Sequence, residues 1–415
     1  MNRKDAPEIQ IIDKIHTGFP ERNGRIFRID SEEAVFKLEI IYPNAGYGIY
    51  KNKFHALYGM DLLLSGTADQ SASEISESLD QLGSFVFKNC DYYNASITIY
   101  GLSEHLENTL KIVHNSIEKC IYVDNELTVY KNRKISELNI NLNKTNFQAN
   151  RAINDLIFGD NHPYSQKSDE KLIQSIQNSE LLEFKKNALT EPYFIYTGPK
   201  ETTIENTIAS FGFDIRGEMP IVIEEKAPVI ACSRKLIPVG GSTQNSIRFG
   251  KILPSRQDPD YFSLSLMNLV LGGFFGSRLM KNIREEKGLT YGIHSSITPF
   301  KKFSLFKISS ECNNELSETV KNEIEKEIIQ LQTDLISDEE LTIARNYMLG
   351  SLLRNFDGAF NISERLKAYL ELETEQGYYE RYFLAINQIT PEQIRACANN
   401  YLDIKTLNYC VAGEV

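Results

Sequence analysis

The stretch FHALYGMDLLLSG, residues 54–66, matches YFSLSLMNLVLGG, residues 261–273, without a gap and at an offset of 207 residues. In both stretches apolar side chains recur at three- and four-residue spacing up to a closing glycine, which predicts an amphipathic helix with a glycine stop. Because the offset is half of the 415 residues, the chain is predicted to contain a duplication.

The segments around the two helices repeat as well. Val35–Tyr42 and Ile247–Leu253 predict strands that each end at a proline, and Tyr93–Tyr100 and Phe303–Ser309 predict a further strand after each helix. Strands and helices alternate within each half. The expected fold class is therefore α+β, with two duplicated domains, each an antiparallel-rich sheet covered by helices.

The predicted boundary lies where the pattern stops. Ile215–Pro228 mixes Gly, Pro and charged residues without helical or alternating period, which is typical of a linker. We expect a first domain over residues 1–215, a linker over 216–230 and a second domain over 231–415.

Three features of the second half predict helices. Leu316, Val320, Ile324 and Ile328 form an apolar stripe at four-residue steps, which must be buried against other elements. The stretches 337–340 and 390–393 each have the pattern of a capping box, so a helix should begin at both.

Charge and composition exclude some function classes. The net charge of −11 would repel phosphate backbones, so nucleic acid is an unexpected partner. No apolar stretch is long enough for a signal peptide or a membrane span, and six widely spaced cysteines without a C-x-x-C pair predict buried thiols in a reducing compartment. These observations predict a cytoplasmic protein that is not embedded in a membrane.

A longer signature suggests a family. The segment Leu271–Tyr291, LGGFFGSRLMKNIREEKGLTY, resembles the second-domain signature of the insulinase-like zinc metallopeptidases, which include pitrilysin and the mitochondrial processing peptidases. Residues 63–83 resemble the loop and helix that follow the family's metal helix, and Asp160–Tyr164 resembles its His-Pro-Tyr landmark. The resemblance implies two α+β domains that form one half of a clam-shell peptidase chamber.

The resemblance fails at the metal motif. Active members carry H-x-x-E-H on the first-domain helix, where two imidazoles bind zinc and a glutamate activates water. Counting back from Gly66-Thr67, the three positions are Leu57, Met60 and Asp61, and His55 has no partner in a shifted register. Leucine and methionine cannot replace a ligand and a base, so we expect no metal in this chain.

The family's third ligand is a glutamate further along the chain. Alignment through Ile135–Leu138 places Thr128 near that position, with Glu126 and Glu137 close by. A lone carboxylate would not hold zinc against water, whichever residue filled that position.

The second-domain signature keeps two residues with chemistry. Arg284 and Tyr291 match the family's substrate clamp, in which a guanidinium and a phenol hold the substrate carbonyl and its developing oxyanion. The alternative is structural: Arg284 pairs with Glu285 or Glu286, and Tyr291 packs in the core. If the clamp holds, Gly272, Gly273 and Gly276 form a loop that needs close backbone approach or positive φ.

The resemblance therefore implies a non-catalytic, substrate-clamping subunit of a heterodimeric peptidase. Its partner would be a related subunit that carries H-x-x-E-H and the zinc, or a second copy of this chain, and its substrates would be peptides. One alternative is a structural scaffold without proteolysis. Another is an active metallopeptidase with an unrecognised site, which would need Asp61 together with Glu126 or Glu137.

Overall fold

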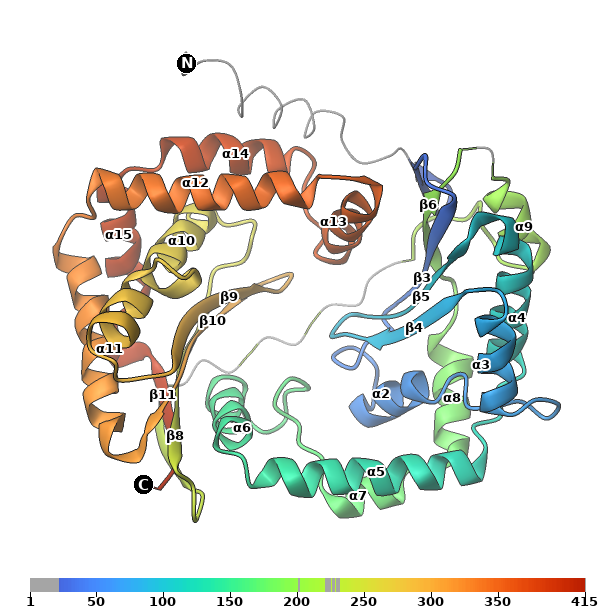
Figure 1. The fold of residues 1–415 in the computed structure, drawn as a ribbon, viewed down its shortest axis with the longest axis horizontal. Coiled ribbons are helices and arrows are strands. Elements are labelled where there is room, and N and C mark those ends of the chain that lie inside the picture. Colours follow the sequence, from blue (N-terminus) through green and yellow to red (C-terminus); the bar gives the residue numbers. More distant parts are fainter. Residues whose placement is uncertain (1–21, 201, 221–224, 226–227, 229–231, 415) are drawn as a thin grey trace.

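Two sheets organise the chain in this computed structural model, which describes residues 22–414 except 201, 221–224, 226–227 and 229–231 (Figure 1). The first sheet has the order β1-β2-β6-β3-β5-β4 and the second β7-β11-β8-β10-β9. The strands of the first are β1 (Arg22–Asn23), β2 (Ile26–Asp30), β3 (Val35–Pro43), β4 (Phe85–Cys90), β5 (Asn94–Leu102) and β6 (Tyr193–Gly198). Those of the second are β7 (Arg234–Pro238), β8 (Gln244–Leu253), β9 (Gly292–Pro299), β10 (Ser304–Asn313) and β11 (Asn408–Gly413).

The sheets confirm the predicted α+β class and its duplication. Starting from β2 and from β7, the five strands follow one another in equivalent order, and in both sheets the first pair is parallel while the others are antiparallel. The repeated segments occupy equivalent places as helices α2 (Lys53–Asp61) and α10 (Tyr261–Asn268).

The remaining helices lie around the sheets. In the first half they are α3 (Ala72–Asp80), α4 (Leu106–Glu118), α5 (Asp124–Leu142), α6 (Thr145–Phe158), α7 (Glu170–Ser175), α8 (Asn178–Ala188) and α9 (Ile204–Ser210). In the second half they are α11 (Ser317–Thr333), α12 (Asp338–Asn355), α13 (Ala359–Glu371), α14 (Tyr378–Gln388) and α15 (Pro391–Tyr401). The predicted stripe lies in and just before α11, where Val320, Ile324 and Ile328 are fully buried.

Helix α6 crosses from the first half to the second sheet. It contacts β8 and β11, and its apolar face enters a buried cluster with second-half residues (Figure 1). A Cβ on Gly250 of β8 would meet Ile157 Cδ1 at 2.5 Å, so only glycine allows the helix to come this close. Cys410 of β11 lies in the same cluster.

Helix α13 makes the reverse crossing and lies against the first sheet. Its Leu366 packs in an apolar cluster with residues of β2, β3 and β6. Beside this cluster Lys37 and Glu39 of β3 are only 1% exposed and pair with each other at 2.9 Å. Lys367 of α13 reaches Glu39 at 3.1 Å, and Ser363 accepts from Lys37 and donates to Glu39 at 2.9 Å each.

The predicted division into domains stays a prediction, because part of residues 216–230 lies outside the described residues. At its beginning the segment is held by the first half, since Arg25 N donates to Ile215 O and Arg25 Nε to Glu218 O. Further along, the buried Glu225 accepts from Tyr93 of the first half and from the backbone of Lys302 in the second.

No helix among the described residues is long and apolar enough to cross a membrane. Four of the six cysteines are buried, and Cys232 is exposed.

Candidate functional site

The helix α2 carries the three positions at which the zinc motif is missing. It begins at Asn52, whose side chain accepts hydrogen bonds from the backbone of Phe54 and His55. Met60 is 1% exposed and lies in the first-half core, and Leu57 packs against the same core. Of these three positions, only Asp61, the last residue of the helix, presents a polar group to solvent.

Asp61 is held by helix α5. Tyr130 OH donates to Asp61 Oδ2, and Lys134 Nζ lies 3.5 Å from the same oxygen. Burial, together with the Asp61 carboxylate, raises the pKa of the Tyr130 phenol, so it remains a donor. The cation that pairs with Asp61 is therefore Lys134, a residue of this chain.

The same lysine bears on the alternative of an unrecognised metal site. Lys134 Nζ also lies 3.6 Å from Glu137 Oε2, so one ammonium group pairs with both Asp61 and Glu137. Thr128 donates to the Asp124 carbonyl within its own helix. In the described part of the chain no three His, Cys, Asp or Glu side chains are grouped as metal ligands would be.

His55 is engaged near the other end of α2. Its Nε2 lies 3.5 Å from Glu180 Oε2, and partial burial lowers the pKa of its imidazole. The side chain is thus a partly buried partner of α8 rather than a member of a ligand set.

The equivalent segment in the second half is built differently. Helix α10 continues into a π-helix at Leu269–Gly273, and after a short loop a second π-helix spans Met280–Glu286. A Cβ on Gly272 would meet Ser295 N of β9 at 2.7 Å, so the expected close backbone approach is present at that glycine. The expected loop is wrong for Gly272 and Gly273, which are helical, and none of the three glycines has a positive φ. π-Helical turns are rare and occur frequently at functional sites.

Arg278 fixes this segment to helix α12. Its Nε and Nη2 donate to the two carboxylate oxygens of Glu340 at 2.7 and 2.8 Å, a bidentate pair. The capping box expected over 337–340 is therefore only half formed: Ser337 Oγ accepts from Glu340 N at 3.1 Å, while the Glu340 carboxylate is turned to Arg278. The box at Thr390 has both bonds, as predicted.

Tyr291 is exposed, whereas Arg284 is half-buried. Tyr291 is 72% exposed, which contradicts the alternative that it packs inside. Within the described residues no ion pair joins Arg284 to a carboxylate, including Glu285 and Glu286, and its guanidinium carbon lies 5.5 Å from the ring centre of the exposed Phe275. The phenol of Tyr291 is thus presented to solvent, and the half-buried guanidinium of Arg284 has no counter-charge among the described residues.

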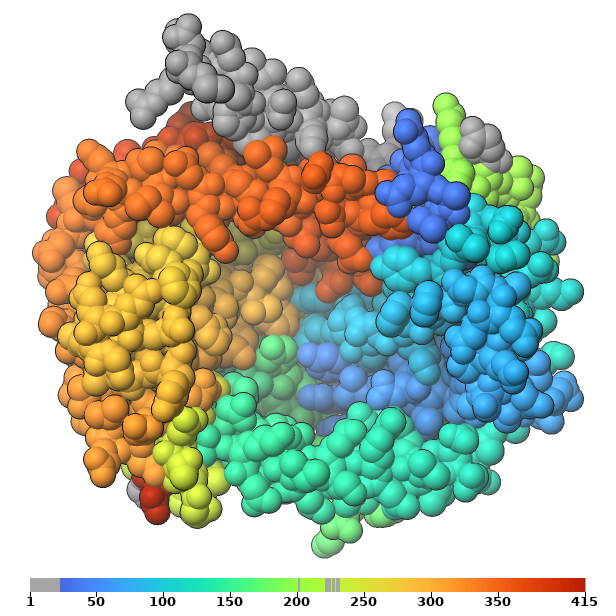
Figure 2. Space-filling view, viewed as in Figure 1, coloured from blue at the N-terminus to red at the C-terminus, as the bar shows by residue number. Residues whose placement is uncertain are grey.

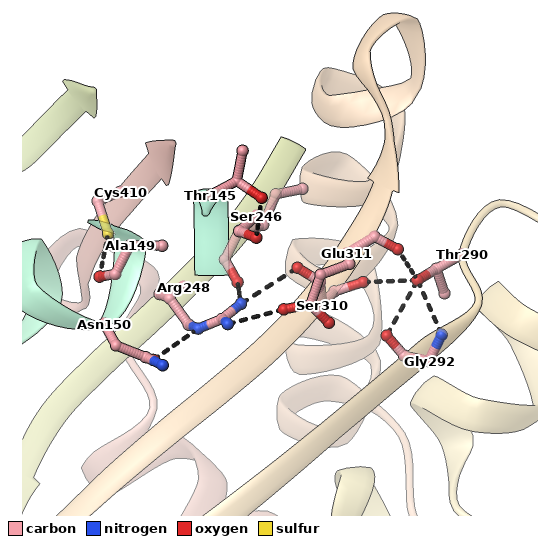
Figure 3. A network of polar contacts seen from close by, with 11 residues as sticks. Thr145, Ala149, Asn150, Ser246, Arg248, Thr290, Gly292, Ser310, Glu311 and Cys410 are labelled. Atoms are coloured by element: carbon pink, nitrogen blue, oxygen red, sulfur yellow. Dashed lines mark hydrogen bonds and ion pairs between the residues drawn. The ribbon is translucent and has the colours of Figure 1, made fainter. Parts of the chain in front are cut away.

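The backbone beside Tyr291 is firmly held (Figure 3). Thr290 is buried, and its hydroxyl lies within hydrogen-bond distance of Gly292 O and of Ser310 Oγ, at 3.0 and 2.9 Å. The same hydroxyl accepts from Gly292 N at 3.2 Å. The backbone position of Tyr291 is therefore fixed, while its exposed side chain keeps its own rotamer freedom.

The anchor belongs to a network that reaches helix α6 (Figure 3). The buried Arg248 of β8 donates to Glu311 Oε1 at 2.7 Å and to Asn150 Oδ1 at 2.9 Å. Glu311 is also the residue whose carbonyl lies next to the Thr290 hydroxyl. Polar contacts therefore run from α6, through β8 and β10, to the residue before Tyr291.

The face shown in Figure 2 is hollowed at its centre, between the two halves. The sheet edge nearest to α2 is strand β4, which contacts α2 and has β5 as its one partner strand within the described residues. Phe85 and Phe87 on β4 are 61% and 59% exposed. An exposed edge strand with apolar side chains is open to pairing with another extended chain.

Sequence reasoning missed Tyr130, Lys134 and Thr290. Thr290 lies inside the quoted signature and could have been noticed as the residue next to Tyr291. The contacts of Tyr130 and Lys134 with Asp61 join residues about 70 positions apart, and no local sequence pattern predicts them.

Several known proteins resemble this chain in sequence. Residues 175–348 match the family model described as the peptidase M16 inactive domain. An uncharacterised zinc protease of Bacillus subtilis, YmxG, is 23% identical over 307 residues, which cover 71% of this chain and 73% of that protein. YmfF of the same organism, a probable inactive metalloprotease, is 26% identical over 137 residues, which cover 33% of this chain and 32% of that protein.

Solved structures share the fold. The peptidase M16 inactive domain from Pseudomonas fluorescens superposes with a TM-score of 0.82 at 23% identity, over 96% of this chain and 98% of that one. The periplasmic protease PqqL from Escherichia coli superposes with a TM-score of 0.76 at 14% identity, over 95% of this chain and 45% of that one. The resemblance to the insulinase-like M16 peptidases is thereby confirmed, and in this peptidase-like chain the zinc-binding motif is missing.

Proposed function

We propose that this chain is the substrate-clamping subunit of a two-chain M16 peptidase, in which a related H-x-x-E-H subunit carries the zinc. The chain itself then needs no metal. The observation that carries the proposal is the presentation of Arg284 and Tyr291. Tyr291 faces solvent beside an anchored backbone, and the half-buried Arg284 has no ion pair among the described residues, in a chain whose own motif positions are filled by Leu57, Met60 and Asp61.

The chemistry of the two groups fits that role. A guanidinium stays charged at every physiological pH and offers several donors, and a phenol adds one short hydrogen bond. Donors fixed in advance stabilise the charge that develops on a carbonyl oxygen during attack on a peptide bond, and each contact is typically worth a factor of about 10²–10³ in rate.

The exposed edge of β4 gives the substrate a place to bind. A peptide in extended conformation would add to this edge through main-chain hydrogen bonds, with Phe85 and Phe87 beside its side chains. Main-chain pairing accepts many sequences, which suits a peptidase that degrades unfolded peptides.

The first experiment is a mild affinity purification of this chain from its own cells, followed by mass spectrometry of stoichiometric partners. Recovery of a relative with H-x-x-E-H supports the proposal, and recovery of the chain alone favours the scaffold. The reconstituted complex is then assayed for peptide cleavage, and a chelator should abolish the activity.

A further inference from the structure

A cavity of about 190 Å³ lies in the second half, away from α2 and from the clamp segment. It is formed by three segments: the loop before α10 at residues 256–259, the turn between β9 and β10 at Lys301, and the connection from α13 to α14 at residues 372–381. Phe262 and Tyr378 supply aromatic walls.

Arg256 in this cavity lies beside the phenols of Tyr261 and Tyr378, yet two of its nitrogens have no hydrogen-bond partner of good geometry among the described residues. Its Nε and Nη1 are buried and have no hydrogen-bond partner among the described residues. The guanidinium carbon lies 4.6 Å from the ring centre of Tyr378, so the positive charge is offset by an aromatic face, but by no carboxylate in that part of the chain. A buried donor without a partner costs about 1–3 kcal/mol, and a charged one more, so such donors call for a ligand.

A second polar atom in the lining is also unsatisfied. Thr374 Oγ1 is buried and has no hydrogen-bond partner within the described residues. A hydroxyl and a guanidinium around one space form a donor set suited to an oxyanion.

The other charged groups of the lining have partners of their own. Lys301 Nζ binds Glu373 Oε1 at 2.9 Å, and Arg381 Nη2 binds Glu375 Oε2 at 3.0 Å. Asp258 accepts from the backbone of Asp260 at 2.9 Å. Arg256 is thus the cation of the lining for which the described residues provide no counter-charge.

We propose that this cavity binds a small oxyanion, a phosphate or a carboxylate group, between the Arg256 guanidinium and the Thr374 hydroxyl. The site is independent of the clamp and of the proposed peptidase role. Its volume accommodates one such group together with a short extension, and the planar guanidinium matches both chemistries bidentately.

The position of the cavity gives binding a structural consequence. Lys301 N donates to Tyr93 OH of the first half at 2.8 Å, and Leu372 packs against the apolar cluster that joins the two halves. An anion in the cavity would therefore tie the connection between α13 and α14 to this junction. An anion that binds the folded chain and not the unfolded chain raises the unfolding temperature.

The test uses the full-length protein, with inorganic phosphate and acetate as separate probes and chloride at equal ionic strength as the reference. Calorimetric titration should give saturable binding of at least one probe, with an upward shift in unfolding temperature. Tighter binding of phosphate would identify a phosphate site, and tighter binding of acetate would identify a carboxylate site.

Arg256→Gln should weaken that binding at least ten-fold and Thr374→Val several-fold, whereas Arg354→Gln, on the exposed part of α12, should leave it unchanged. The Thr374→Val arm keeps the test decisive even where Arg256→Gln unfolds. Absence of saturable binding of both probes to the unaltered protein, or equal affinity in the Arg256 and Arg354 variants, overturns the proposal.

Discussion

Helix α2 and helix α10 occupy equivalent places in two similar halves, yet the segments at their ends have opposite character. In the first half Met60 is buried in the core and the one acidic residue, Asp61, is paired with Tyr130 and Lys134. In the second half the exposed Tyr291 and the half-buried Arg284 lie on a segment fixed by other residues, Arg278 and Thr290. The acidic residue of the first half is thus paired, while in the second half the described residues provide no ion pair for Arg284.

The helices that cross between the halves differ in the same sense. Helix α6 meets the second sheet mainly through an apolar cluster. Helix α13 meets the first sheet through a smaller apolar cluster and a set of buried charges on Lys37, Glu39 and Lys367. The second junction therefore buries more charge against its sheet than the first, and it contains groups whose ionisation can change.

The largest effect is expected at the clamp. Arg284→Ala, in the complex with an H-x-x-E-H partner, should lower kcat by about 10²–10³, because an oxyanion donor is lost. The chain's unfolding temperature should stay the same, because Arg284 supports no ion pair in the described structure. The measurement is steady-state cleavage of a peptide.

Lys281→Ala, on the same π-helix, is the matched control and should retain activity. Equal rates for the two variants would show that Arg284 does not contribute to cleavage, and would favour the alternative that the chain is a structural scaffold.

The second prediction concerns Met60, the buried residue near the end of α2. Met60→Glu should lower the free energy of unfolding by about 3 kcal/mol, because a carboxylate is placed in an apolar core without a partner. Met60→Leu, which conserves volume, should cost less than about 1.5 kcal/mol. Urea denaturation of both variants measures the difference. A Glu variant as stable as the Leu variant would mean that this position opens to solvent.

The third prediction tests the charged junction at α13. Burial, with the nearby Asp91 carboxylate, raises the pKa of Glu371 from its usual 4.5 to about 7. Between these values Glu371 is protonated in the folded chain and ionised in the unfolded one, so its contribution to stability falls as pH rises from about 4.5 to 7. The expected loss is about 1–3 kcal/mol, since a tenfold change in an acid dissociation constant corresponds to about 1.4 kcal/mol.

The readout is the free energy of unfolding as a function of pH, compared with Glu371→Gln. That variant should lack this part of the slope, whereas the exposed Glu339→Gln on α12 should keep it. Parallel curves for all three proteins would place the titration elsewhere.

The smallest effect is expected at Lys134. Lys134→Met removes the ammonium group shared by Asp61 and Glu137, and since these side chains are partly exposed, the cost should be at most about 1 kcal/mol. Because the pair is screened by ions, the difference from the unaltered chain should shrink in high salt. A loss of several kcal/mol would instead mark the contact as a principal support of α2.

Local patterns predicted a good part of this architecture. The two repeated helices, the strands on either side of them, the buried stripe of α11 and the cap at Thr390 all follow from periodicity and capping chemistry that extend over a few residues. Gly272 was expected to need close approach, and β9 lies against it.

The sequence could not predict contacts between distant residues. Arg278 takes the carboxylate that the capping box at Ser337 would have used, and Arg278 and Glu340 are 62 positions away from each other along the chain. Periodicity shows that α6 and α13 each have an apolar face, but it does not tell which sheet that face meets. The exposure of Tyr291 also depends on where the neighbouring segments fold.

Because α6 packs on the second sheet and α13 on the first, each half needs a helix from the other to cover its sheet. Without α13, a fragment that ends in the predicted linker, residues 216–230, would leave Phe27, Ile29 and Ile41 uncovered along with the buried Lys37 and Glu39. A fragment that begins after the linker would likewise lack α6 over β8 and β11. A protease cut in the linker would therefore yield two pieces that stay bound and unfold as a single unit, although the backbone between them is broken.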